Sequence, residues 1–330
     1  MRLNKPTLAV VIPCYNEEAV LPLTSKLFLS EVLTLIAHEK IAENSYILFV
    51  DDGSNDNTWG LIKALAQQDD HFVGIALSRN RGHQNALLAG LMEARDRADI
   101  SISIDCDGQD DCAAMEQMVD AYHDGFEIVY GVRSSRESDA FFKRVSAEGF
   151  YKILHLMGVD VVFNHADYRL LSKRVLDEFS HFTEVNLFLR GMIPLVGFRS
   201  TSVYYERHER IAGKSHYPLK KMFTLALDGM TSLSVKPIRL ITSAGFVISI
   251  LSFLGVIWAI VASVTGQSVA GWSSLLSVIC FMGGIQMLSL GVIGEYVGKI
   301  YMETKHRPRF IIGETTYGNL DENEPDHCIR

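Results

Sequence analysis

Short apolar runs alternate with amphipathic stretches along the first two thirds of the chain. The runs predict five strands, at 8–14, 46–52, 72–78, 100–107 and 127–132. The stretches between them predict four helices, at 17–38, 56–68, 83–98 and 113–124. Runs that are apolar throughout are typical of parallel strands buried on both faces. Their alternation with helices predicts an α/β fold, with a doubly wound, mainly parallel sheet.

The hydrophobic pattern changes after residue 217. From Leu240 to Gly294 the chain contains no Asp, Glu, Lys, Arg or His. Because a membrane span needs about 20 apolar residues, this stretch predicts two transmembrane helices, at 240–264 and 274–294. Its length disfavours the alternative, a buried helix pair in a soluble core. The segment 218–239 is amphipathic, which favours helices at the membrane interface over an ordinary surface helix.

Positive charges flank the two expected spans but are missing from the loop between them. They are Lys220, Lys221, Lys236 and Arg239 before the first span, and Lys299, Lys305, Arg307 and Arg309 after the second. The positive-inside rule then places both termini in the cytoplasm, on a multi-pass protein of the cytoplasmic membrane. We expect a catalytic domain at 1–217, juxtamembrane helices at 218–239, the spans at 240–298 and a cytoplasmic tail at 299–330.

The net charge and the cysteine pattern indicate which partners the protein binds and in which compartment it lies. The chain has 330 residues and a net charge of -8, which argues against nucleic acid as a partner because phosphate binding needs a basic surface. Its five cysteines are scattered, without the spacing of a metal site or a disulfide framework. A reducing compartment is therefore expected.

Polar residues follow four of the predicted strands. They lie at 13–17, 51–54, 78–80 and 105–107. Ligands of open parallel sheets bind at the carboxyl ends of strands, so these turns predict one shared crevice. The Gly-rich motif of dinucleotide-binding folds and the P-loop motif are both missing, which argues against a Rossmann dehydrogenase and a P-loop enzyme.

Two of these polar residues, Asp105 and Asp107, form a D-x-D motif. Its carboxylates lie on one side of an extended backbone, as suits a divalent cation that also holds substrate phosphates. Gln109 could add a third oxygen. A Ca²⁺ loop of the EF-hand type is excluded, because Asp110 occupies the position where that loop requires Gly.

Several motifs occur together and in order. They are VVIPCYNEE (10–18), VDDGSNDNT (50–58), LSRNRGHQNALLAGL (77–91), DCDGQD (105–110), GVRSSRESDAFFKR (131–144), ADYRLLSKRV (166–175), FLRG (188–191), RIAGKSHYPLKK (210–221) and RPRF (307–310). With them the chain resembles the membrane-bound polyprenyl-phosphate glycosyltransferases of family 2, which include dolichol-phosphate mannose synthase and GtrB-type bactoprenol glucosyltransferases. The resemblance implies a GT-A fold, a nucleotide-sugar donor, a polyprenyl phosphate acceptor and Mg²⁺ or Mn²⁺.

The resemblance also implies site residues. For the nucleotide-sugar they are Pro13, Tyr15, Glu17, Asp52, Gly82 and Asp105; for the metal they are Asp105, Asp107 and Gln109. For the acceptor phosphate they are Arg136, Lys143, Arg144, Arg207, Arg210, Lys214 and Ser215; Asp167, Arg133 and Asp107 are expected to be catalytic. Three alternatives stay open: Tyr15 simply packs against its neighbours, Arg210 is a surface charge, and Asp167 forms a salt bridge with Arg169.

An ionised phosphate acceptor changes what the catalytic residues must do. A lipid phosphate is mostly ionised near pH 7, since its second pKa is about 6. Its oxygen can attack without the general base that a hydroxyl acceptor needs. We therefore expect Asp167 to orient the sugar or acceptor and to act as a base only weakly.

Four positions depart from the family pattern around the expected donor pocket: Arg81, His83, Gly108 and Asp111. A UDP-sugar, first of all UDP-glucose, is the favoured donor. GDP-mannose as donor and a non-catalytic sugar-lipid binding protein are the alternatives. A processive synthase would need a Q-x-x-R-W segment and more spans. The resemblance also suggests a homo-oligomer, with a tetramer as one option.

Overall fold

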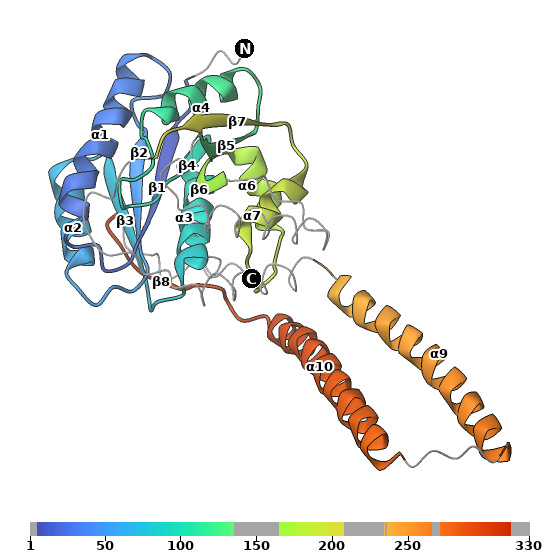
Figure 1. Ribbon diagram of the computed structural model, residues 1–330. Coiled ribbons are helices and arrows are strands. Elements are labelled where there is room, and N and C mark those ends of the chain that lie inside the picture. Colours follow the sequence, from blue (N-terminus) through green and yellow to red (C-terminus); the bar gives the residue numbers. More distant parts are fainter. Residues whose placement is uncertain (1–4, 135–164, 208–233, 235, 266–270, 318–330) are drawn as a thin grey trace.

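An eight-stranded mixed sheet forms the centre of the catalytic part. The computed structural model describes residues 5–134, 165–207, 234, 236–265 and 271–317 (Figure 1). The strand order is β7-β5-β6-β4-β1-β2-β3-β8. In chain order the strands are β1 (Leu8–Cys14), β2 (Tyr46–Asp51), β3 (Phe72–Leu77), β4 (Ile100–Ser103), β5 (Ile128–Arg133), β6 (His165–Ser172), β7 (Ser200–Tyr205) and β8 (Ile312–Thr315).

Helices cover both faces of this sheet. They are α1 (Leu21–Ala37), α2 (Thr58–Gln68), α3 (His83–Arg97), α4 (Ala114–His123), α6 (Lys173–Ser180) and the short α7 (Leu189–Met192), which continues into the 3₁₀ turn η1 (Ile193–Val196). β1 is buried over its whole length. Because successive side chains point to opposite faces, Val10 and Ile12 pack on the side of α1, α2 and α4, while Ala9 and Val11 pack on the side of α3 and α6. The prediction of a doubly wound α/β fold is confirmed.

The strands β4, β1, β2 and β3 are parallel and in register, as the apolar runs predict. Val10 of β1 pairs with Ile47 of β2 on one side and with Ile102 of β4 on the other. The carboxyl ends of these strands therefore reach the same edge of the sheet. This edge carries the four polar turns that the sequence places after the strands.

Three strands were not among the predicted ones, β6, β7 and β8. β7 is parallel to its neighbour β5, whereas β6 and β8 are antiparallel to theirs. β6 lies between β4 and β5 and is antiparallel to both. β8 pairs with the edge strand β3, with Ile75 opposite Thr315 and Leu77 opposite Ile312. The segment that we expected to be a cytoplasmic tail therefore contributes a strand to the sheet of the catalytic part.

Two long helices project from the sheet, α9 (Lys236–Val264) and α10 (Trp272–Thr304) (Figure 1). Large apolar side chains on both are exposed, including Trp258, at 68%, and Met287, at 72%. Within the described residues, Lys236–Gly255 has the length and mean hydropathy, 1.8, of a membrane span. The two predicted helices are confirmed. The membrane crossing of α10 and the orientation of the pair stay predictions.

The boundaries of these helices differ from the expected ones. Lys236 and Arg239 belong to α9, not to a separate juxtamembrane segment, and α10 continues ten residues beyond the predicted end at Gly294. The extra turns of α10 carry Glu303, whose contacts are described below. The rest of the predicted juxtamembrane helices, apart from Ser234, lies outside the described residues.

Candidate functional site

The turns after β1 and β2 are tied together by side chains. The Asn16 N–H donates to Ser54 Oγ (2.9 Å), and the Asn55 N–H donates to Asn16 Oδ1 (2.8 Å). The Glu17 N–H donates to Thr58 Oγ1 (2.9 Å). These bonds hold the β1–α1 turn against the start of α2 and leave the Tyr15 side chain 43% exposed. The ring of Tyr15 is therefore partly open to solvent, and its expected role in binding the nucleotide stays a prediction. Pro13 lies within β1 and pairs with Val50.

Asp52 uses both carboxylate oxygens on the loop between β3 and α3. Oδ1 accepts from the Arg81 N–H (2.7 Å), and Oδ2 accepts from the Gly82 N–H (2.9 Å). Gly82 has a φ of 85°, a conformation that favours glycine. Burial raises the pKa of Asp52, although the two N–H groups partly offset this effect. Asp52 and Gly82, both predicted donor residues, thus shape the loop that presents His83.

Asp105 of the D-x-D motif lies among other carboxylates. Its Oδ1 is 3.7 Å from His83 Nε2. Burial raises the pKa of Asp105. His83 opposes this rise, and Asp110, Asp167 and Asp107 each raise the pKa further. A cation bound beside Asp105 would therefore stabilise its ionised form.

The other two predicted metal ligands have contacts within the D-x-D turn. Asp107 Oδ1 accepts from the Gln109 N–H (3.1 Å). The Gln109 side-chain oxygen accepts a hydrogen bond from Arg207 Nη2. In the described part of the chain, no three His, Cys, Asp or Glu side chains are arranged to hold a metal ion. Asp105 and Asp107 fit a divalent cation, because carboxylates are its preferred ligands and their surroundings favour positive charge. Gln109 would first have to release Arg207.

Asp167 has several cationic partners. It pairs with Arg169, and Arg190 approaches through Nε (3.2 Å to Oδ1) and Nη2 (3.0 Å to Oδ2). His83 Nε2 lies 3.5 Å from Oδ2. Burial opposes ionisation, but Arg190, His83 and Arg169 outweigh it and hold the pKa of Asp167 well below its usual range. The salt bridge between Asp167 and Arg169, an open alternative from the sequence, is confirmed.

This arrangement makes Asp167 a weak base. Arg169 is fully buried, and its Nε and Nη1 have no hydrogen-bond partner among the described residues, so the guanidinium depends on Asp167 for neutralisation. Burial works against the charge of His83, yet Asp167 and Asp105 raise its pKa overall. The sequence did not predict Arg190 as a partner of Asp167, because the two are 23 positions apart and meet only in the folded chain.

Asp110 organises a second cluster beside the D-x-D motif. Its Oδ1 accepts from Tyr205 Oη (2.7 Å) and from Arg133 Nη2 (3.2 Å). Asp110 is buried, and it also forms an antiparallel bridge with Arg207. Arg133, expected to be catalytic, and Arg207, expected near the acceptor phosphate, therefore lie at the D-x-D turn with carboxylate or amide partners. The remaining predicted phosphate ligands lie outside the described residues: Arg136, Lys143, Arg144, Arg210, Lys214 and Ser215.

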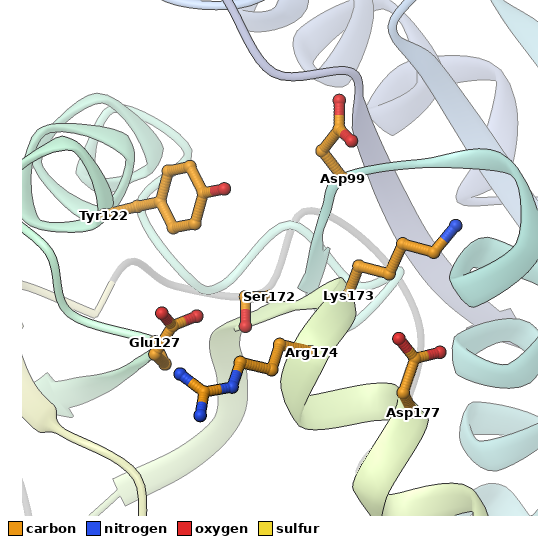
Figure 2. Close-up of a pocket in the computed structure, with 7 residues that line it drawn as sticks. All are labelled: Asp99, Tyr122, Glu127, Ser172, Lys173, Arg174 and Asp177. Atoms are coloured by element: carbon orange, nitrogen blue, oxygen red, sulfur yellow. The ribbon is translucent and has the colours of Figure 1, made fainter. Parts of the chain in front are cut away.

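A separate hollow of about 330 Å³ lies at the opposite edge of the sheet (Figure 2). Its lining is Asp99, Tyr122, Glu127, Ser172, Lys173, Arg174 and Asp177. Asp99 and Glu127 directly precede β4 and β5, so this hollow lies at the amino ends of parallel strands. Figure 2 shows the guanidinium of Arg174 lying toward Glu127. Ligands of open α/β sheets bind at the other edge, so the hollow is distinct from the candidate site.

Comparison with known proteins adds independent findings. The family model described as glycosyl transferase family 2 matches residues 9–180, and the model described as GtrB C-terminal hairpin matches residues 236–300. The uncharacterized glycosyltransferase YkoT of Bacillus subtilis (strain 168) is 48% identical over 317 residues, which cover 96% of this chain and 94% of that protein. The bactoprenol glucosyl transferase of Shigella phage SfV is 38% identical over 307 residues, which cover 92% of this chain and 97% of that protein.

One solved structure aligns with most of the chain. The mannosyltransferase PcManGT from Pyrobaculum calidifontis, in complex with GDP-Man and Mn²⁺, covers 90% of this chain and 85% of its own. The identity is 15% and the TM-score is 0.43. A likeness this distant says nothing about the donor or the metal of the present chain.

Proposed function

Because this chain belongs to glycosyl transferase family 2, we propose that it moves a monosaccharide from a nucleotide-sugar to a polyprenyl phosphate such as undecaprenyl phosphate. The observation that carries the proposal is the match of residues 236–300 to the GtrB C-terminal hairpin, on a chain 38% identical to a bactoprenol glucosyl transferase. A UDP-sugar is the favoured donor, with UDP-glucose first. GDP-mannose is the alternative donor.

The proposed reaction inverts the configuration at C1 of the sugar. An oxygen of the ionised lipid phosphate donates an electron pair to C1 and forms the new C–O bond. The bond from C1 to the diphosphate breaks, and the nucleoside diphosphate leaves with its electron pair. No proton has to be removed from the acceptor, so the main tasks are positioning and stabilisation of the leaving charge.

The D-x-D carboxylates and the turn after β1 form the proposed donor side. Asp105 and Asp107 would hold Mg²⁺ or Mn²⁺, which supplies charge neutralisation at the diphosphate. The raised pKa of Asp105 supports this role, since burial and, to a lesser extent, three neighbouring carboxylates disfavour its negative charge. Tyr15 presents an exposed ring at the same edge of the sheet, in a position suited to stacking with a base. Glu17 is assigned to the same nucleotide pocket.

Asp167 is proposed to orient a substrate rather than to accept a proton. Its lowered pKa makes it a poor proton acceptor, which agrees with an acceptor that needs no base. Held by Arg190 and His83, it would orient the sugar or the incoming phosphate next to Asp105. Arg207 is proposed to meet the acceptor phosphate, with Arg133 beside it. The cytoplasmic location of this site and of both termini, and assembly into a homo-oligomer, remain predictions.

The proposal is tested with purified full-length protein, undecaprenyl phosphate and a panel of UDP- and GDP-sugars, with Mg²⁺ or Mn²⁺. Mass spectrometry of the lipid fraction should detect a monosaccharide linked to the lipid phosphate with at least one UDP-sugar, and EDTA should abolish the product. A product only with GDP-mannose would assign the alternative donor. Absence of product with every donor would reject the transferase and leave the sugar-lipid binding protein.

A further inference from the structure

The chain that leaves α10 runs back along the sheet domain to β8 (Figure 1). On this path, residues 303–310, here called the strap, contact two loops of the candidate site. One is the loop 78–82 between β3 and α3, which ends at His83. The other is the loop 181–188, which leads into α7 and Arg190. His83 and Arg190 both face Asp167.

Glu303, near the end of α10, binds the second loop through four hydrogen bonds. The Val185 N–H donates to Oε1 (2.8 Å) and Oε2 (3.0 Å). The Asn186 N–H (3.1 Å) and Nδ2 (2.9 Å) both donate to Oε1. A negative charge in the last turn of a helix opposes the helix dipole. The position of Glu303 is therefore explained by its contacts with the loop rather than by the helix itself.

Arg81 connects the strap to the first loop. Its Nε donates to the Arg309 carbonyl (2.7 Å), and its Nη2 donates to the Pro308 carbonyl (2.7 Å). Arg309 is buried, and its Nη1 donates to the Phe182 carbonyl (2.9 Å). The strap therefore joins both loops, and the backbone N–H of Arg81 holds Asp52 at the same time.

The two loops also meet directly. Gln84, the residue after His83, accepts a hydrogen bond from the Leu189 N–H (2.9 Å), one residue before Arg190. Short chain segments therefore connect Glu303 to Asn186, Leu189, Gln84 and His83. A displacement of the end of α10 can therefore be transmitted through these contacts to His83 and Arg190, which hold Asp167.

We propose that Glu303 and Arg81 are positioning residues, which let the end of helix α10 set the placement of Arg190 and His83 on Asp167. The expected effect on kcat rests on the proposed function. The expected effect on the placement of the two loops rests on the contacts described above. Catalytic groups must be held within about 0.5 Å of the productive geometry by their supporting contacts. Loops without regular structure, such as 78–82 and 181–188, need such external support.

The test is a double-mutant cycle with Glu303→Ala, Arg190→Lys and the double variant, measured as lipid-linked sugar formed. Glu303→Ala should lower kcat about 10- to 100-fold, the range that a misplacement of about 1 Å produces, and change the donor KM little. In the Arg190→Lys background the same substitution should have less than about a 3-fold effect, because coupled residues are not additive. Additive effects would overturn the inference, since a merely structural loss does not depend on Arg190.

Conservative variants and a matched control keep the result interpretable. Glu303→Gln retains one acceptor oxygen and should fall between wild type and Glu303→Ala. Arg81→Lys cannot reach both carbonyls and should also lower kcat. Glu178→Gln neutralises an exposed carboxylate on α6 and should match wild type. If Glu303→Ala, Glu303→Gln and Arg81→Lys lost activity only in proportion to their loss of thermal stability, the positioning role would be rejected.

Amide hydrogen exchange separates this inference from the proposed function. Glu303→Ala should speed exchange at 185–192 and at 83–86, while Glu178→Gln should not. This result is expected even if no donor supports transfer by wild type, an outcome that would reject only the function. Unchanged exchange at both segments would overturn the positioning role, whether or not wild type is active.

Discussion

Asp105 and Asp167 both lie near Nε2 of His83, yet their electrostatic surroundings are opposite. Asp167 has Arg190, Arg169 and His83 around it, and its pKa is held well below the usual range. Asp105 has His83 on one side and three further carboxylates near it, and its pKa is raised. Neighbouring groups whose environments push their pKa values apart are suited to different tasks. Asp167 is already neutralised by the protein, whereas Asp105 still favours an added cation.

The comparison predicts opposite responses of the two carboxylates to neutralisation. Asp167→Ala should destabilise the protein by about 3–5 kcal/mol, because it leaves the fully buried Arg169 without its counter-charge. Denaturant unfolding of the detergent-solubilised protein measures this effect. Arg169→Met in the same background should restore part of the loss. Unchanged unfolding of Asp167→Ala would contradict the assignment of the salt bridge.

Asp105→Asn should affect activity rather than stability. We expect transfer to fall about 100- to 1,000-fold, the loss typical of removing one electrostatic contact to the transition state. The free energy of unfolding should stay equal or rise, because one of several mutually repelling carboxylates is gone. Parallel assays of transfer and unfolding check both parts. Loss of stability with retained transfer would reverse the roles assigned to the two residues.

The pH dependence of stability should separate the two carboxylates further. A carboxyl with a lowered folded pKa contributes stability that is fully present above its unfolded pKa and is lost as pH falls through the folded pKa. For Asp167 the unfolded reference is 3.8. The stability gap between wild type and Asp167→Asn should therefore widen or hold from pH 7 to about pH 5, where His83, whose pKa Asp167 raises, gains charge, and it should shrink below 3.8. Unfolding measured at pH 7, 5 and 3 checks the window, and a gap that narrows between pH 7 and 5 would argue against it.

A smaller effect is expected at the Asp110 cluster. Tyr205→Phe removes the hydroxyl that donates to Asp110 Oδ1 (2.7 Å), while Arg133 remains to hold the same oxygen. The cost should be about 1–3 kcal/mol, the penalty for a buried acceptor that loses a partner. Thermal unfolding of the purified variant measures it. Tyr204→Phe, at an exposed neighbouring position, is the matched control and should be neutral.

Sequence patterns predict much of this fold because the central strands carry their own signal. β1 and β2 are apolar throughout, and their polar turns mark the edge where the site lies. β6 carries no such signal, since Asp167 and Arg169 interrupt its apolar positions, and their pairing becomes visible only in the fold. β8 is short, and its place depends on β3, which lies more than 230 positions earlier in the chain.

The site shows the same division. The D-x-D motif and Asp52 stand out in the sequence because they follow buried strands. Arg190, Tyr205 and Glu303 do not stand out, because they reach Asp167, Asp110 and the loop 181–188 from distant segments through tertiary contacts. Arg81 and His83 are noticeable only as departures from the family pattern. The structure gives both a contact: Arg81 binds the strap, and His83 lies between Asp105 and Asp167.

The most direct test of the account measures UDP binding by titration calorimetry, with and without Mn²⁺, for wild type and Asp105→Asn. The account predicts that Mn²⁺ strengthens UDP binding to wild type at least about tenfold, since a cation held by Asp105 would neutralise charge on the diphosphate. Asp105→Asn should bind UDP equally weakly under both conditions. UDP binding to wild type that is independent of Mn²⁺, or a Mn²⁺ effect that survives Asp105→Asn, would contradict it.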